Sequence, residues 1–110
     1  MSRSPHVRLS DPHFAERVRV SFERQQAMAL IRAEMPVIEH GHTEIHLPHW
    51  PGIEQQHGFV HGGVVGMIAD SAAGYAAMTV VPASASVLTV EYKMNLMAPA
   101  DGEKLIARGR

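Results

Sequence analysis

Two different spacings of hydrophobic residues divide this chain into helices and strands. A helical spacing follows Asp11-Pro12, which predicts an amphipathic helix with Asp11 as its N-cap, Pro12 at its first position and an end near Arg24. Its apolar side carries Phe14, Val18 and Phe22. The apolar run 27–31 then fits either a last helical turn or a buried connection.

Strands are predicted where apolar residues alternate with polar ones and turn residues stand on either side. These segments are a first strand at Val37-Ile38, a second at 43–47, a half-buried third at 87–97 and a fourth that begins at Glu103. His40-Gly41-His42 is predicted to be the hairpin turn between the first two strands. The segments 48–56 and 98–102 are predicted to be loops.

One long helix is predicted from about Gly62 to Thr79, in an apolar stretch that contains a single carboxylate, Asp70. At 100° per residue, Asp70 shares its face with small residues, while Val64, Ile68 and Tyr75 fall on the opposite face. The small residues are Gly63, Gly66, Ala73, Gly74 and Ala77. Because glycine inside a helix costs roughly 1 kcal/mol relative to alanine, this stripe predicts close approach of a substrate or a second subunit.

Three structural alternatives compete with a functional role for Asp70. The stretch could span a membrane, although its flanks are not basic and a central Asp costs about 2.5 to 3.5 kcal/mol on insertion scales. Asp70 could instead pair with a distant Arg inside a buried helix. It could also cap a second helix that begins at Ser71, which would need a break in the first helix.

Composition narrows the class of protein. The chain has 110 residues, a formal net charge of −1 and no cysteine. A charge near zero argues against a nucleic-acid partner or an anionic membrane. The lack of cysteine excludes disulfides, thiolate catalysis and Cys-based zinc sites. The first five residues lack the features of a signal peptide, so we expect a cytoplasmic protein with one domain over residues 1–110.

A resemblance to a known family is carried by Ser21-Phe22-Glu23-Arg24-Gln25, which is similar to that family's N-terminal entry, and by two longer segments. One is Gln55-Gln56-His57-Gly58-Phe59-Val60-His61-Gly62-Gly63, with Asp70 seven residues after its last glycine. The other is Thr89-Val90-Glu91-Tyr92-Lys93-Met94-Asn95-Leu96-Met97-Ala98-Pro99-Ala100, with Gly102 beyond it. Together they resemble the hotdog-fold acyl-CoA thioesterases, and most closely the phenylacetic acid degradation branch. The resemblance covers essentially the whole chain.

This resemblance implies an α+β hotdog fold, in which a curved antiparallel sheet wraps a long central helix. It also implies a homodimer or homotetramer with active sites at the subunit interface, and hydrolysis of an acyl-CoA substrate without a metal or other cofactor. The implied roles are Asp70 as nucleophile or general base, the Gly62 N–H as the group that polarises the carbonyl, Gln55 and His61 as further catalytic residues, and Gly63 and Thr89 as substrate-binding residues.

Elementary chemistry agrees with these roles. A helix N-terminal N–H stabilises the negative charge that develops on a carbonyl under attack, and an Asp carboxylate is ordinarily ionised at neutral pH. Gly62 and Asp70 stand about 12 Å apart along one helix. We therefore expect the two groups that act on one carbonyl to come from different subunits.

Members of the resembled family continue through two more strands, so we expect a sheet that lacks its last strands and leaves Leu105 and Ile106 incompletely buried. Two alternative functions stay open at this point: a hotdog dehydratase or hydratase, and a catalytically silent fragment that acts as an interaction module.

The eight histidines raise the question of a metal site. The pairs His40/His42 and His57/His61 have ligand-like spacings, but no Asp or Glu completes a zinc pattern. We expect no functional metal and assign His61 an orienting or structural role.

Overall fold

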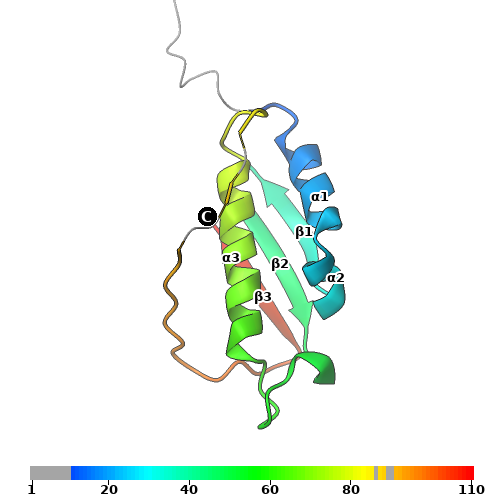
Figure 1. Ribbon diagram of the computed structural model, residues 1–110, viewed down its shortest axis with the longest axis vertical. Coiled ribbons are helices and arrows are strands. Elements are labelled where there is room, and N and C mark those ends of the chain that lie inside the picture. Colours follow the sequence, from blue (N-terminus) through cyan, green and yellow to red (C-terminus); the bar gives the residue numbers. More distant parts are fainter. Residues whose placement is uncertain (1–10, 86, 89–90) are drawn as a thin grey trace, which may run out of the picture.

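The computed structural model describes residues 11–85, 87–88 and 91–110. In chain order, the elements are α1 (Phe14–Arg24), α2 (Gln26–Ile31), β1 (Glu34–Glu39), β2 (His42–Pro48), the 3-10 helix η2 (Pro51–Ile53), α3 (Gly62–Met78) and β3 (Lys104–Gly109). The strands form one antiparallel sheet in the order β1-β2-β3. The long helix α3 lies along this sheet, with α1 and α2 beside it (Figure 1), which confirms the predicted α+β architecture.

The core lies between α3 and the sheet. Thr43, Ile45 and Leu47 alternate along β2 and are fully buried, because successive side chains of a strand point to opposite faces. In β3, a Cβ added at Gly109 would collide with the Ala72 backbone of α3. The Thr43 hydroxyl donates to the Ala72 carbonyl oxygen at 2.7 Å. Both contacts hold α3 close to the strands.

The predicted start of the first helix is wrong by two residues, since the N-cap is His13 and not Asp11. Asp11 precedes α1, which begins at Phe14, and its side chain accepts a hydrogen bond from the His13 backbone N–H at 2.9 Å. This bond closes a turn that contains Pro12. The other carboxylate oxygen pairs with Arg17 at 3.1 Å. The predicted end at Arg24 is confirmed, and the apolar run that follows it lies in the separate short helix α2.

The predicted strand over 87–97 does not form in the part of that segment that the structure describes, residues 87–88 and 91–97. The segment runs outside the sheet, alongside α3 (Figure 1). A Cβ added at Gly66 would lie 3.0 Å from the Tyr92 hydroxyl, and one at Gly62 would lie 3.1 Å from Leu96 Cδ1. The alternation therefore marks a face that packs on the glycines of the helix, and it does not specify a hydrogen-bonded neighbour.

Other predictions hold. The turn at Gly41 (φ 77°) is confirmed, and the bounds predicted for β2 and for the start of β3 are right to within one residue. β1 contains the predicted Val37-Ile38 but begins three residues earlier, at Glu34. The helix α3 is continuous through Ser71, so the predicted alternative of a second helix starting there is wrong. Within the described residues, no helix is both long and apolar enough to cross a membrane. Ile106 stays 37% exposed and Leu105 is only partly buried, as expected.

Candidate active site

The N-terminus of α3 is fixed by the histidine that precedes it. The His61 ring Nδ1 accepts a hydrogen bond from the Gly63 N–H at 2.8 Å, and the His61 N–H donates to the Ile53 carbonyl at 2.9 Å. The first N–H groups of a helix have no intrahelical acceptor. Among the described residues none accepts from the Gly62 N–H, so it remains available to a ligand, whereas the Gly63 N–H is used by the cap.

Gln55 and Gly62 line the same cleft, which has a volume of about 570 Å³. Val65 forms part of its wall, and the segment 95–100 forms the opposite side. The side-chain oxygen of Gln55 accepts from the His57 N–H in a turn. The Gln55 NH₂ group is then the part of this side chain that can donate to a bound carbonyl.

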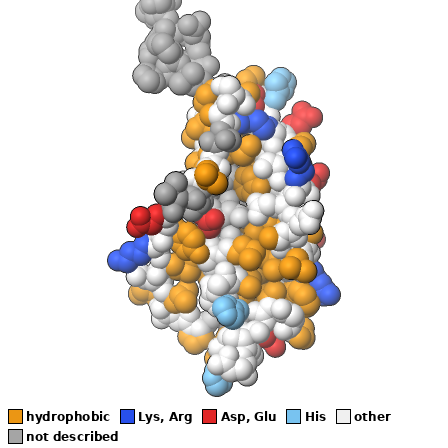
Figure 2. Space-filling model, in the orientation of Figure 1, with side chains coloured by type: hydrophobic (Ala, Val, Ile, Leu, Met, Phe, Trp, Pro, Cys, Tyr) orange, Lys and Arg blue, Asp and Glu red, His pale blue; other side chains and the backbone are white. Residues whose placement is uncertain are grey.

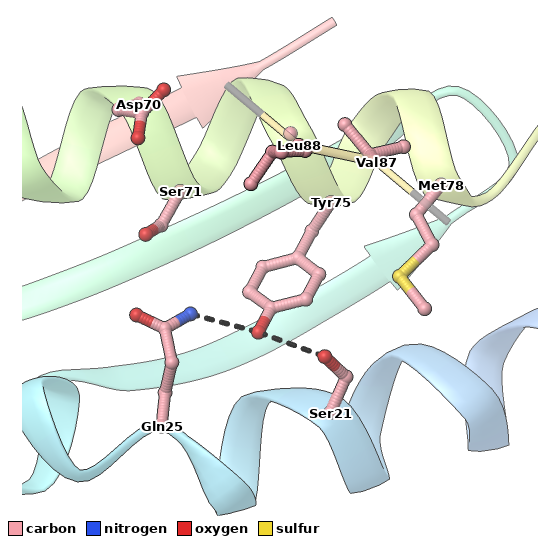
Figure 3. Close-up of a pocket in the computed structure, with 9 residues that line it drawn as sticks. Ser21, Gln25, Asp70, Ser71, Tyr75, Met78, Val87 and Leu88 are labelled. Carbon is pink, nitrogen blue, oxygen red and sulfur yellow. Dashed lines mark hydrogen bonds between the residues drawn. The ribbon is translucent and has the colours of Figure 1, made fainter. Parts of the chain in front are cut away.

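Asp70 lines a different cleft, of about 430 Å³, between α3 and α1 (Figure 3). Asp70 is half-buried on α3. Ser71, Gly74, Tyr75 and Met78 of α3 line the cleft with it, as do Ser21 and Gln25 from the α1 side and Val87 and Leu88 from the segment beyond α3. The volume is in the range of small-molecule pockets.

The α1 side of this cleft is joined to α3 by hydrogen bonds from Ser21 and Gln25 to Tyr75 of α3. The Gln25 Nε2 donates to the Tyr75 hydroxyl at 2.8 Å, and the Ser21 and Tyr75 hydroxyls are 3.2 Å apart (Figure 3). The Tyr75 ring is buried and meets Phe22 edge-on, with centroids 6.1 Å apart. Sequence reasoning missed Ser21, Gln25 and Tyr75 as site residues. The resemblance of the segment from Ser21 to Gln25 to the family's N-terminal entry was the available signal for the first two.

The predicted catalytic residues therefore fall into two groups. Gln55 and Gly62 stand together in one cleft, and Asp70 stands in another, on the same helix. Eight residues of helix correspond to about 12 Å. His61 precedes Gly62 as the N-cap of α3 and accepts from the Gly63 N–H, and Thr89 lies outside the described residues.

Ionisable groups with shifted pKa values lie away from Asp70. Hydrogen bonding from His46, helped by His42 and Arg108, lowers the pKa of Glu44 on β2. A hydrogen bond to the Gly102 carbonyl, and then the partner Glu54, raise the pKa of His49. In the described ranges, no group of three or more His, Asp or Glu side chains is placed to hold a metal ion.

Comparison with known proteins gives consistent likenesses. The family model of the thioesterase superfamily matches residues 57–110. A thioesterase family protein from Silicibacter pomeroyi is 43% identical with a TM-score of 0.84, over 86% of this chain and 70% of that one. A Bacillus halodurans protein solved with CoA is 25% identical with a TM-score of 0.68, over 84% of this chain and 64% of that one.

The PaaI protein of the E. coli phenylacetic acid degradation operon shares the fold at 14% identity, with a TM-score of 0.76 over 86% of this chain and 67% of that one. No curated protein matches the sequence.

Proposed function

Since this chain belongs to the thioesterase superfamily, we propose that it hydrolyses an acyl-CoA thioester at a site that two subunits build together. That membership confirms the predicted hotdog fold and the predicted enzyme class, together with the likeness to the phenylacetic acid degradation type. The roles of individual residues and the assembly are our proposal.

One observation supports the shared site above all. Asp70 and the Gly62 N–H lie in separate clefts, about two turns apart on α3. A catalytic group and an oxyanion donor must both lie about 3 Å from the reacting atoms. Within one subunit, neither Asp70 nor the Gly62 N–H has the other beside it. A homodimer, or a homotetramer built from two dimers, supplies both halves to one carbonyl.

The chemistry follows from these two groups. Asp70 either attacks the thioester carbon itself or takes a proton from the water that attacks it. The carbonyl oxygen gains negative charge, which the Gly62 N–H and the positive end of the α3 dipole stabilise. The C–S bond then breaks and the CoA sulfur takes up a proton. On the general-base route this releases the free acid directly, whereas on the nucleophilic route water hydrolyses the acyl-Asp70 anhydride, which releases the free acid and restores the carboxylate. Gln55 donates a second hydrogen bond to the carbonyl or orients the water.

The matched substitutions Asp70→Asn and Gly62→Pro test these roles. Asp70→Asn keeps the shape and removes the carboxylate, so kcat for an acyl-CoA should fall at least about 100-fold with KM little changed. Gly62→Pro removes one N–H from the first position of α3, where proline fits a helix. His61 already has φ −57° and ψ 132°, the conformation that a following proline favours. Gly62→Ala keeps the N–H and is the control.

Mixing the two defective chains tests whether the site is shared. A mixed dimer of Asp70→Asn and Gly62→Pro chains contains one site with both native groups only if those groups come from different subunits. Random mixing should then restore up to about a quarter of the wild-type activity. Activity that stays at the level of the separate variants contradicts the shared site. Full activity of Asp70→Asn contradicts the catalytic role.

A further inference from the structure

The side chain of Arg17 ties together the segments that close one end of the Asp70 cleft. Its guanidinium donates to three backbone carbonyls: Met78 at 2.8 Å, Ala85 at 3.0 Å and Val81 at 3.1 Å. Its Nε lies 3.1 Å from the Asp11 carboxylate, which is itself buried. Four segments of the chain meet at this one cation.

These carbonyls belong to the C-terminal end of α3 and to the connection that follows it. The last carbonyls of a helix lack intrahelical donors and carry partial negative charge, so a cation there is stabilising. Met78 is the last residue of α3 and lines the Asp70 cleft. Ala85 stands two residues before Val87, which lines the cleft with Leu88. Arg17 thus fixes the end of the helix and the chain that passes over it.

We propose that Arg17 is a positioning residue that sets the shape of the acyl-binding end of this cleft. The proposal rests on the proposed function, in which the thioester carbonyl lies at Asp70 and the acyl chain extends along α3 toward Met78. Arg17 does not line the cleft. It acts by holding Met78, Val87 and Leu88 in place, and it therefore governs how well a longer acyl chain binds.

A lysine cannot replace these contacts. The planar guanidinium presents five donors in a fixed fork, whereas an ammonium group is a compact charge with three rotatable donors. Lysine at position 17 can keep the charge near Asp11 and reach one carbonyl. The remaining carbonyls lose a charge-assisted hydrogen bond, and the connection over residues 79–85 loses its tie to α1.

Arg17→Lys is tested against Asp11→Asn, which is the matched control. Asp11→Asn removes the buried ion pair and lowers the melting temperature, but it leaves the three carbonyl contacts of Arg17 in place. The readout is the ratio of KM for octanoyl-CoA to KM for acetyl-CoA. We expect Arg17→Lys to raise this ratio about 5- to 10-fold, and Asp11→Asn to leave it unchanged.

A merely structural role for Arg17 predicts a different result: Arg17→Lys would lower the active fraction, reduce the maximal rate equally for both esters and leave the KM ratio at the wild-type value. That result overturns the proposal. If Arg17→Lys folds poorly, the double variant Asp11→Asn/Arg17→Gln removes both members of the ion pair, so no buried carboxylate is left unpaired. It should raise the ratio at least as much.

Failure of the proposed function is recognised separately. If the wild-type chain hydrolyses neither ester, the thioesterase proposal fails. In that case, calorimetry measures the affinities of octanoyl-CoA and acetyl-CoA for the same variants, made in the Asp70→Asn background. The ratio of the two affinities then replaces the KM ratio, because no turnover is needed. An unchanged affinity ratio in Arg17→Lys overturns the positioning role on its own.

Discussion

Gly74 leaves open the path from Asp70 into the rest of the cleft. It stands one helical turn after Asp70, lines the same cleft, and a Cβ added there would meet no atom within 4 Å. We predict that Gly74→Leu lowers the ratio of kcat/KM for octanoyl-CoA to that for acetyl-CoA at least about 10-fold, because the new side chain fills the space that a longer acyl chain needs.

Stability should not explain that effect, since leucine is favoured over glycine in a helix by up to about 1 kcal/mol. Ala73→Leu adds a comparable side chain at the neighbouring exposed position, which does not line the cleft, and it should leave the ratio unchanged. Equal losses for both esters in Gly74→Leu would contradict a role in chain-length selection.

At the scale of single residues, the sequence indicated which residues matter but not which other residues contact them. The spacing of small residues around Asp70 predicted a helix, which is confirmed, and close approach to one of its faces, but it could not say what approaches that face. Gly66 is met by Tyr92 of the same chain, while Gly74 opens onto the Asp70 cleft. His61 was assigned an orienting or structural role, and the structure gives it a definite one, as the N-cap of α3. Such contacts join residues far apart in sequence, so periodicity alone cannot predict them.

Among the elements, a helical period proved more reliable than alternation. The helix over 62–79 was predicted almost to the residue, because an apolar stretch of that length followed by a loop has few other solutions. Alternation over 43–47 gave a true strand, whereas the same pattern over 87–97 gave an extended segment that packs on α3 in its described part. A strand also needs an adjacent free edge, which no local pattern encodes.

The loop before α3 is held to the turn before β3 by His49. Its ring Nδ1 lies 2.9 Å from the Gly102 carbonyl oxygen, and its Nε2 lies 2.9 Å from the Glu54 carboxylate. Both nitrogens face acceptors, and both can donate only when the ring is protonated. The Gly102 carbonyl and Glu54 accordingly raise the pKa of His49 above its ordinary value of 6.5.

This raised pKa makes stability depend on pH in a definite direction. The folded state binds the His49 proton more tightly, so the stabilisation is complete below pH 6.5 and is lost as pH rises through the raised pKa. We predict a smaller free energy of unfolding at pH 8 than at pH 6, measured with urea, and a smaller difference in His49→Gln. His57→Gln, exposed in the same loop, should retain it.

Glu44 affects stability with the opposite dependence on pH, and its effect falls outside the range from pH 6 to pH 8. Its pKa is lowered, chiefly by hydrogen bonding from His46, so its contribution is present above pH 4.5 and is lost as pH falls. The comparison between pH 6 and pH 8 therefore isolates His49 from Glu44. A pH difference that is unchanged in His49→Gln would contradict the assignment.

For the whole molecule, large apolar side chains remain exposed at the mouths of both clefts. Leu88 at the Asp70 cleft is 85% exposed, and Met97 at the Gly62 cleft is 91% exposed. Figure 2 shows hydrophobic side chains on the surface over the segment beside α3. Grouped apolar exposure of this kind marks interaction sites. A second subunit that covers both mouths would also complete the catalytic site.

Activity should therefore depend on association. We predict that the specific activity of the chain falls on dilution in parallel with the fraction of dimer or tetramer measured by sedimentation. Met97→Glu places a charge in the expected interface, so it should shift both transitions to a protein concentration at least about 10-fold higher, because an unpaired interfacial charge costs more than about 1.4 kcal/mol. A monomer with full activity at assay concentration would contradict the shared site, since one subunit alone presents Asp70 and Gly62 in separate clefts.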